Sequence, residues 1–490
     1  MTIALRSSSL AELSENVRIP SYDRAQLSTG IIHIGVGNFH RAHQAIYLHK
    51  LLELGEAKEW AICGAGIKSY DEIMRNKLAQ QDWLTTVVEL EEGNIQAQVC
   101  GAMIDFVDVD AGKLIAKMAQ ESVKIVSLTI TEGGYFIDPD TGLFDTTNAE
   151  IQSDISTPTQ PKTVFGMIIQ ALIKRMQEGV NAFTVMSCDN VPHNGDVTKK
   201  AVLGLAKEID TSLAQWIESH VSFPNSMVDC IAPAVTNEQI KRIEDMFGIQ
   251  DQAPVVCESF RQWVLEDNFV NGRPALEKVG VQFVDDVAPY ELMKLRVLNG
   301  GHAALAYPAG LMGIEYVHEA MQNETITQYL EKLITDEAIP SLPEVAGIDV
   351  HDYLQIIKQR FSNAEVKDTI ERLYQDGQNR LPKFILSTIS DNIDASRSIN
   401  GLSLVIALWC KLCMRANSPE GNINLHDDSA SVLTEKALLA NSSAEAFIGM
   451  TEVFGGLSSN DLFASLFKKW LHKLVNKGVE ATLQSYISNK

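Results

Sequence analysis

GIIHIGVGNFHRAHQA, residues 30–45, predicts a strand, a tight turn and the start of a helix. Its β-branched first half is typical of a buried strand, and apolar residues at helical spacing predict a helix over 38–54. Gly35 and Gly37 match the first two glycines of the G-x-G-x-x-G fingerprint, in which a pyrophosphate approaches the backbone at a helix N-terminus. His40 takes the place of the third glycine, so the helix has to lie slightly further from the strand.

These residues predict a dinucleotide-binding turn, although an ordinary strand–turn–helix without a ligand also fits the motif. The residues that we expect to contact the cofactor here are Gly35, Gly37, Asn38, Phe39, His40 and Arg41. For His40 and His43 we favour packing or orientation of the turn over metal binding, because no acidic or cysteine partner lies nearby in the sequence.

Three further apolar runs predict strands of the same sheet: EWAICGA (59–65), KIVSLTI (124–130) and AFTVMSC (182–188). Their nearly continuous hydrophobicity is typical of parallel strands that are covered on both faces. Residues 163–179 predict a helix that Thr163 caps and Gly179 ends. The fold class is therefore α/β, with a doubly wound, Rossmann-type N-terminal domain.

From about residue 286 to the C-terminus, helical periodicity dominates. A chain of 490 residues is too long for one typical core, so we expect two domains. We predict a dinucleotide-binding domain over 1–285 and a mostly α-helical substrate and catalytic domain over 286–490.

Charge and cysteine content exclude several classes of protein. A net charge of −22 argues against binding of nucleic acid or an anionic membrane, since both require a positive surface. The longest apolar stretch, 402–410, is far shorter than the roughly 18 residues that span a bilayer, and the N-terminal sequence lacks the apolar core of a signal peptide.

Seven scattered cysteines do not form a disulfide framework, so we expect a cytoplasmic protein. For the C-x2-C pair Cys410 and Cys413 we favour core packing over metal or redox chemistry.

Asp71 is the candidate for the acidic residue that binds the adenosine ribose of the cofactor. The alternative is a charge at the N-terminus of a helix. The nearby Lys68 would favour a 2′-phosphate, so the sequence favours NAD and leaves NADP open. Glu132, in TEGGY after a predicted strand, is a further candidate for contact with the cofactor or the substrate.

Residues 285–307, DDVAPYELMKLRVLNGGHAALAY, predict a helix with Pro289 at its first position. At about 100° per residue, and with Lys294 at zero, Glu291 lies near about 60°, His302 near about 80° and Asn299 near about 140°. Such a polar stripe is usually a solvated face. Here apolar residues surround Lys294, and the pair Gly300-Gly301 predicts an interruption of the helix where backbone approaches a ligand.

This combination of side chains suits oxidation of an alcohol. Hydride transfer requires a base for the hydroxyl proton and donors that stabilise the developing alkoxide. Burial lowers the pKa of a lysine, so Lys294 can act as the base. Asn299 provides one donor, and Asn190, at the end of the strand AFTVMSC, is placed to provide the second.

The pattern K-x4-N-x2-H resembles the signature of the long-chain polyol-specific dehydrogenases, the mannitol dehydrogenase family. The resemblance runs from about residue 18 to the C-terminus through GVGNFHRAHQA (35–45), SLTITEGGY (127–135), FTVMSCDNVPHNG (183–195), HVSFPNSMVD (220–229), QWVLEDNFVNGRPALEKVGVQF (262–283) and RLPKF (380–384). It implies a metal-free and often monomeric enzyme that interconverts D-mannitol and D-fructose with NAD(H).

The resemblance also implies roles for individual residues. Lys294 is the general acid/base, Asn190 and Asn299 hold the oxyanion, and Glu291 assists proton exchange with solvent. The residues that it implies for binding the polyol are His302, Arg372, Arg380 and Asp229.

Two positions depart from the family pattern. Tyr70-Asp71 replaces a common Glu-Asp pair at the position that selects the cofactor, and Arg380 replaces a familiar lysine, which keeps the charge but alters the geometry. Three alternatives stay open: reduction of D-fructuronate to D-mannonate, a non-enzymatic dinucleotide sensor, and a zinc dehydrogenase, which the absence of a Cys/His cluster disfavours.

Overall fold

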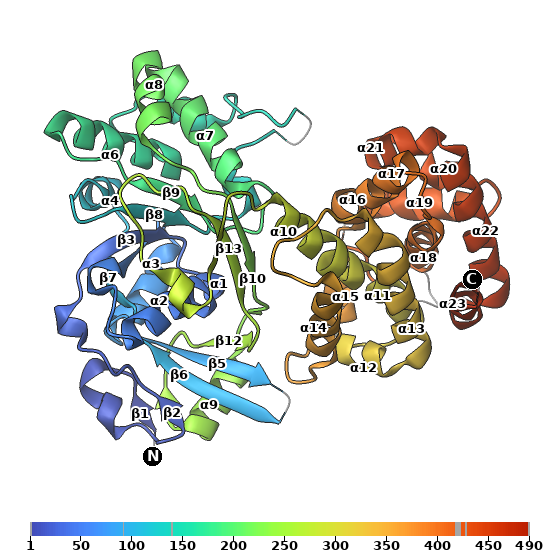
Figure 1. Ribbon diagram of the computed structural model, residues 1–490, viewed down its shortest axis with the longest axis horizontal. Helices are drawn as coiled ribbons and strands as arrows, with labels where there is room; N and C mark the ends of the chain where they lie inside the picture. Colours follow the sequence, from blue (N-terminus) through green and yellow to red (C-terminus); the bar gives the residue numbers. More distant parts are fainter. Residues whose placement is uncertain (1, 92, 139–140, 417–422, 427–428, 489–490) are drawn as a thin grey trace. The chain divides into compact units, whose positions relative to one another are not determined.

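The computed structural model describes residues 2–91, 93–138, 141–416, 423–426 and 429–488. The chain divides into two compact units, Met1–Ala288 and Pro289–Lys490 (Figure 1). The boundary expected from the sequence lies a few residues before this division. Each unit is described by itself.

A five-stranded parallel sheet forms the centre of the N-terminal unit. Its order is β7-β4-β3-β8-β9, with bounds Met103–Phe106, Ala61–Ala65, Thr29–Ile34, Ile125–Leu128 and Thr184–Ser187. The chain runs outward from β3 on one side and then returns to β8 on the other. The strand order therefore reverses between β3 and β8, which is where α/β proteins of this kind bind ligands. The predicted doubly wound α/β fold is confirmed.

Strand β3 is buried throughout because helices cover both of its faces. Ile32 and Ile34 pack in one cluster with Phe165 of α6, whereas Ile31 packs in another with Leu51 of α2. The helices of this unit are α1 (Asn38–Ala42), α2 (Gln44–Glu53), α3 (Asp71–Ala79), α4 (Ala111–Met118), α5 (Ala149–Ser156), α6 (Val164–Glu178), α7 (Asn194–Ile209), α8 (Thr211–His220) and α9 (Asn237–Phe247).

Two helix predictions have different outcomes. Helix α6 begins and ends as predicted, because the Thr163 hydroxyl accepts a hydrogen bond from Gly166 N at 3.1 Å and Gly179 has φ +69°. The prediction of one helix over 38–54 is wrong at His43, whose φ of −114° and ψ of −85° separate α1 from α2.

The described part of the N-terminal unit also contains three smaller sheets, none of which was predicted from the sequence. The first is β12-β5-β6-β2, with bounds Val255–Glu258, Thr85–Glu91, Asn94–Cys100 and Val17–Arg18. The second is β10-β13-β14, with bounds Ser226–Asp229, Gln262–Glu266 and Gln282–Val284. The third pairs β1 (Ile3–Ala4) with β11 (Ile249–Gln250).

The C-terminal unit is mostly helical, as predicted. Its α-helices are α10 (Ala288–Met293), α11 (Gly300–Leu311), α12 (Val317–Gln322), α13 (Glu324–Leu333), α14 (Val350–Ser362), α15 (Ile370–Tyr374), α16 (Gly377–Leu381), α17 (Ser387–Asp394), α18 (Asn400–Arg415), α19 (Ala430–Ala440), α20 (Glu445–Ile448), α21 (Thr451–Phe454), α22 (Asp461–Lys477) and α23 (Val479–Ile487). Three π-helical segments, Lys294–Asn299, Ile334–Ala338 and Pro382–Leu386, continue neighbouring helices.

Helix α18 crosses the core of this unit. Cys410 and Cys413 are both fully buried on it, which agrees with their predicted packing role. No helix among the described residues is both long and apolar enough to cross a membrane.

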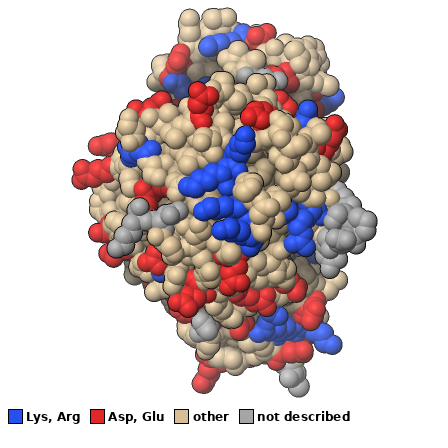
Figure 2. All heavy atoms as spheres, turned by 90° about the vertical axis from the view of Figure 1, so that its right-hand side faces the viewer, with Lys and Arg blue, Asp and Glu red and all other residues tan. Residues whose placement is uncertain are grey.

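Charge is unevenly distributed over the surface. Figure 2 shows the face that carries the C-terminal helices, where Lys and Arg side chains gather near the middle and Asp and Glu lie around them. The excess of negative charge in the chain is therefore not spread evenly over this face.

Candidate active site

The glycine turn lies at the carboxyl end of β3, where the strand order reverses. Gly35 has φ +99°, and a Cβ there would lie 2.0 Å from the carbonyl oxygen of Thr129, so only glycine fits. Gly37 is exposed, and a Cβ on it would meet only the Gly35 oxygen, at 4.0 Å. The backbone at Gly37 thus leaves open space that a pyrophosphate can approach, and the residues present fit a dinucleotide.

Asn38 and Arg41 hold this turn through their side chains. Arg41 is buried and donates to Asn38 Oδ1 at 2.8 Å and to the Gly37 carbonyl at 3.2 Å. Asn38 donates to the carbonyl of Pro233 at 3.1 Å. Phe39 stacks on His43, with 5.0 Å between the ring centroids. These contacts within the protein fix the shape of the turn.

Two stacked histidines, His33 and His40, lie next to the turn, and only His40 was predicted from the sequence to belong to it. The rings of His33 and His40 are parallel within 9°, with centroids 3.4 Å apart, so His40 fills the space that a third glycine would have left. His33 Nε2 lies 2.9 Å from Thr129 Oγ1, which donates to the Gly35 carbonyl at 2.6 Å. Burial lowers the pKa of His40 to about 4 and holds the pKa of His33 well below its usual range. Both rings are therefore neutral at pH 7. The sequence feature that could have identified His33 is its position as a polar residue within a mostly apolar strand.

Asp71 is the first residue of α3, so it is a charge at a helix N-terminus, and it follows the turn after β4, where the adenosine of a dinucleotide is expected. Its Oδ2 accepts hydrogen bonds from the backbone N–H groups of Ile67 and Lys68, both at 2.9 Å. A hollow of about 360 Å³ lies beside this turn and is lined by residues that include Lys68, Ser69, Asp110, Glu150 and Lys162. Asp71 thus shapes a turn next to a space large enough for part of a cofactor.

Asp189, at the end of β9, holds the loop that follows β8. Its carboxylate accepts hydrogen bonds from Ile130 N (2.9 Å), Thr131 N (3.0 Å) and the Tyr135 hydroxyl (2.6 Å), while burial raises its pKa. Thr131 has φ +65°, a strained conformation that these bonds support. Two predicted site residues flank this arrangement: Glu132 begins the turn Glu132–Tyr135, and the exposed Asn190 directly follows Asp189.

Asp229 is the last residue of β10 and is only 4 % exposed. It pairs in register with Gln262 of β13, so a neighbouring strand determines its position. Asn190 and Asp229 therefore both lie at strand ends of the N-terminal unit.

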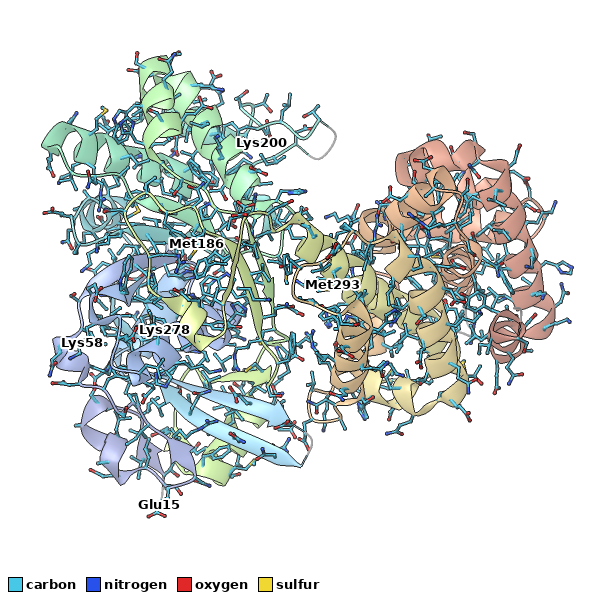
Figure 3. The ribbon with its side chains drawn as sticks, in the orientation of Figure 1. Glu15, Lys58, Met186, Lys200, Lys278 and Met293 are labelled. Carbon is cyan, nitrogen blue, oxygen red and sulfur yellow. The ribbon has the colours of Figure 1, made fainter. Side chains whose placement is uncertain are left out.

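The predicted catalytic segment of the C-terminal unit is not a regular α-helix. Lys294 is the first residue and Asn299 the last residue of the π-helical segment between α10 and α11. Figure 3 labels Met293, which ends α10 directly before Lys294. The angles worked out at 100° per residue are therefore wrong across this segment. A π-helical turn inside an α-helix is rare and is frequently found at functional sites.

Burial also distinguishes this stripe from a solvated helix face. Glu291, Lys294 and His302 are 7 %, 6 % and 7 % exposed, and Asn299 is partly buried. Removal of these polar groups from water costs free energy unless they interact with one another, with the backbone or with a ligand.

The prediction that Gly300 and Gly301 interrupt the helix is wrong. Both belong to α11, and the irregularity lies before them. A Cβ on Gly301 would lie 3.6 Å from Phe361, an ordinary contact distance. The glycines therefore lie against neighbouring residues of the same unit.

His302 lies in a cluster of cationic side chains. Its ring stacks on Phe361 at 4.1 Å, and burial, together with the charges of Arg372, Arg360 and Arg380, holds its pKa well below the usual range. Arg372 is exposed and pairs with Asp368 at 2.7 Å. Arg380 donates to the Leu373 carbonyl at 2.8 Å.

Arg360, on α14, is a residue of this cluster that the sequence analysis missed. It is 8 % exposed. In the sequence, Arg360 is recognisable only as an arginine beside an aromatic residue in a helix. Such pairs are common on solvated helix faces.

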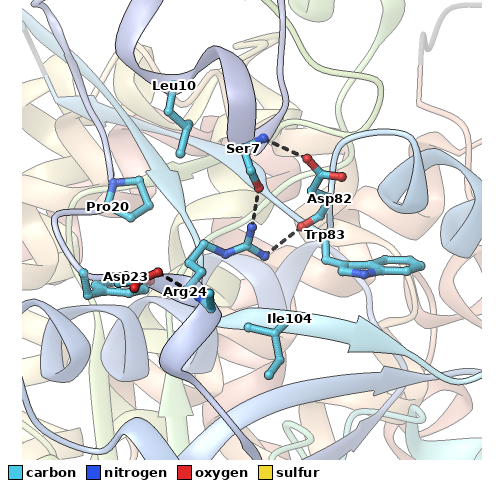
Figure 4. Close-up of a pocket in the computed structure, with 10 residues that line it drawn as sticks. Ser7, Leu10, Pro20, Asp23, Arg24, Asp82, Trp83 and Ile104 are labelled. Atoms are coloured by element: carbon cyan, nitrogen blue, oxygen red, sulfur yellow. Dashed lines mark hydrogen bonds between the residues drawn. The ribbon is translucent and has the colours of Figure 1, made fainter.

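Another hollow of the N-terminal unit lies elsewhere. It has a volume of about 550 Å³, and in it Arg24 donates to Ser7 Oγ at 2.8 Å and to the Asp82 carbonyl at 2.7 Å (Figure 4). None of its lining residues is a predicted site residue. Within the described part of the chain, no group of three or more His, Cys, Asp or Glu side chains could hold a metal ion.

The glycine turn and the reversal of strand order define a dinucleotide-binding protein of the Rossmann type, joined to a separate helical unit. Family models agree with this class: residues 29–278 match the mannitol dehydrogenase Rossmann domain, and residues 286–475 match the mannitol dehydrogenase C-terminal domain. The chain belongs to the mannitol dehydrogenase family, which confirms the resemblance found in the sequence.

Relatives cover the chain from end to end. A mannitol 2-dehydrogenase of Cereibacter sphaeroides is 47% identical over 97% of this chain and 100% of its own length. The structure of Pseudomonas fluorescens mannitol 2-dehydrogenase, a ternary complex with NAD and D-mannitol, covers 100% of both chains with 42% identity and a TM-score of 0.87. A polyol:NADP oxidoreductase of Gluconobacter oxydans is 40% identical over 84% of this chain and 85% of its own.

Proposed function

We propose that the protein is an NAD-dependent mannitol 2-dehydrogenase that interconverts D-mannitol and D-fructose without zinc. The observation that carries the proposal is the buried Lys294 at the start of a π-helical segment that ends at Asn299. The similarity over the whole chain to an enzyme bound to NAD and D-mannitol supports it.

When bound, NAD would supply the acceptor for the hydride that leaves the alcohol carbon. The glycine turn at Gly35 and Gly37 binds the pyrophosphate, and Asp71 binds the adenosine ribose. A dinucleotide-binding role for residues 1–285 and a substrate-binding role for 286–490 follow from these assignments.

Lys294 takes the proton of the substrate hydroxyl as hydride leaves, and returns it in the reverse direction. The amides of Asn190 and Asn299 donate hydrogen bonds to the oxygen, whose negative charge grows in the transition state. Glu291 passes the proton between Lys294 and solvent. The neutral His302 and the adjacent arginines orient the remaining hydroxyls.

Reduction of D-fructuronate is the second candidate, and one observation favours it. Three guanidinium groups, those of Arg360, Arg372 and Arg380, contribute to the electrostatic field at His302, and arginine binds carboxylates well. Asp368 already neutralises Arg372, which favours an uncharged polyol over a uronate.

A spectrophotometric assay with NAD and NADP tests the proposal, with mannitol, arabinitol, sorbitol and mannonate as substrates. We expect the highest kcat/KM with NAD and mannitol, and unchanged rates in EDTA. Loss of activity in EDTA contradicts zinc independence. A preference for mannonate favours the second candidate, and no turnover with any substrate contradicts both.

A further inference from the structure

An ion pair lies beside the turn that carries the predicted ribose-binding residue. Lys68 Nζ lies 2.7 Å from Glu150 Oε1 and 2.9 Å from Oε2, so both carboxylate oxygens of Glu150 bind the ammonium. The backbone N–H of Lys68 also binds Asp71. Lys68 thus links the turn after β4 to the first turn of α5, and both lysine and glutamate line the 360 Å³ hollow.

Stability does not explain this pair well. The Lys68 and Glu150 side chains are 37% and 45% exposed, and exposed ion pairs typically contribute about 0–1 kcal/mol to folding. Because both residues line the hollow, the ion pair can affect the binding of a ligand there.

We propose that Glu150 is a specificity-determining residue, which neutralises Lys68 and thereby makes the protein select NAD over NADP. This inference rests on the proposed function. The two cofactors differ by a phosphate on the 2′-oxygen of the adenosine ribose. At the corresponding place in Rossmann proteins, an acidic residue binds the free hydroxyl and a cationic residue accommodates the phosphate.

The chain contains both kinds of residue at this turn. Asp71 provides the carboxylate, and the Lys68 ammonium would attract a phosphate that carries about −1.5 to −2 charges at pH 7. Glu150 cancels this attraction and places a further negative charge beside the phosphate. One of the named relatives is a complex with NAD and another is a polyol:NADP oxidoreductase, so a residue that determines the choice between NAD and NADP has a role in this family.

The test measures binding of NADH and NADPH separately from turnover. Loss of one unit charge at 4 Å in water changes a binding energy by about 1 kcal/mol, so we expect Glu150→Gln to strengthen NADPH binding relative to NADH about five- to tenfold. High salt should reduce the gain, because screening weakens it. The Lys68→Met variant should bind NADPH no better than the original protein.

A double-mutant cycle then assigns the gain to Lys68. In Lys68→Met, the further change Glu150→Gln should raise NADPH affinity less than it does in the original protein, because only the direct repulsion between Glu150 and the phosphate is then removed; an equal gain there would overturn the inference and point instead to Lys162, which also lines the hollow. Glu56→Gln is the matched control, since Glu56 binds Lys278 at 2.7 and 2.8 Å with similar exposure, and it should not alter the preference.

The outcomes separate the inference from the proposed function. If neither NADH nor NADPH binds the original protein, the proposed function is wrong. If NADH binds and Glu150→Gln leaves the ratio of the two affinities unchanged, only the role of Glu150 is wrong. The thermal melting temperature of each variant shows that it is folded before binding is measured.

Discussion

Replacement of His40 by phenylalanine should make the N-terminal unit less sensitive to acid. Burial lowers the pKa of His40 to about 4 in the folded protein, against 6.5 for an exposed histidine. The unfolded chain therefore binds more protons than the folded one between these values, and the free energy of unfolding falls as the pH falls through this window. The loss attributable to His40 is about 2 kcal/mol at pH 5 and reaches at most about 3 kcal/mol below pH 4.

Hydrogen exchange of peptides covering residues 29–53 at pH 8 and pH 5, corrected for intrinsic rates, measures this loss locally. A chain with two units is not expected to unfold in a single step, so a global denaturation curve is less suitable. Phenylalanine keeps a flat ring against His33. It leaves Gln44 Oε1 without its donor, but that cost is the same at both pH values and cancels in the difference.

In His40→Phe, the drop in local stability from pH 8 to pH 5 should be smaller than in the original protein by about 2 kcal/mol. The control is His220→Phe: His220 is exposed and lies outside residues 29–53, so exchange of these peptides should not change. An identical drop in His40→Phe and the original protein would refute the reasoning that His40 is buried in its neutral form.

Three further predictions concern the proposed chemistry. Lys294→Ala should lower kcat by about 10²- to 10⁴-fold with partial rescue by small primary amines, and a normal rate would exclude Lys294 as the base. Asn299→Ala should destabilise the transition state by about 3 kcal/mol, measured as a fall in kcat/KM for mannitol at saturating NAD. A change confined to the KM for mannitol would contradict a role in holding the oxyanion. Arg360→Leu should raise the KM for the polyol several-fold and leave the KM for NAD unchanged, whereas an equal effect on both would show that Arg360 only supports the fold.

The sequence predicts those parts of the fold where one local rule applies. The run of apolar residues before Gly35 predicted β3, because a strand covered on both faces has no polar side. Thr163 and Gly179 predicted the ends of α6, because capping depends on single residues. The sheets formed by β5, β6, β10 and β12 to β14 were missed, since their pairing depends on residues far apart in the chain.

The candidate site was predicted unevenly for similar reasons. The spacing of residues identified Lys294 and Asn299. The angles between them assumed an α-helix, whereas the segment is π-helical, and this geometry depends on packing that the hydrophobic periodicity does not encode. His33 and Arg360 were missed because their environments arise from distant elements: Thr129 contacts His33, and His302 lies within the field of Arg360. The pairing of Lys68 with Glu150 also joins residues that are far apart in the sequence.

The pairing of β1 with β11 has a consequence for synthesis of the chain. Ile3 lies in register with Ile249, so β1 receives its partner only after almost the whole N-terminal unit has been made. At roughly 5–20 residues per second, the interval is roughly 12–50 s, during which β1 remains an unpaired edge. The strand has only two residues, and a template this short offers little to a neighbouring nascent chain.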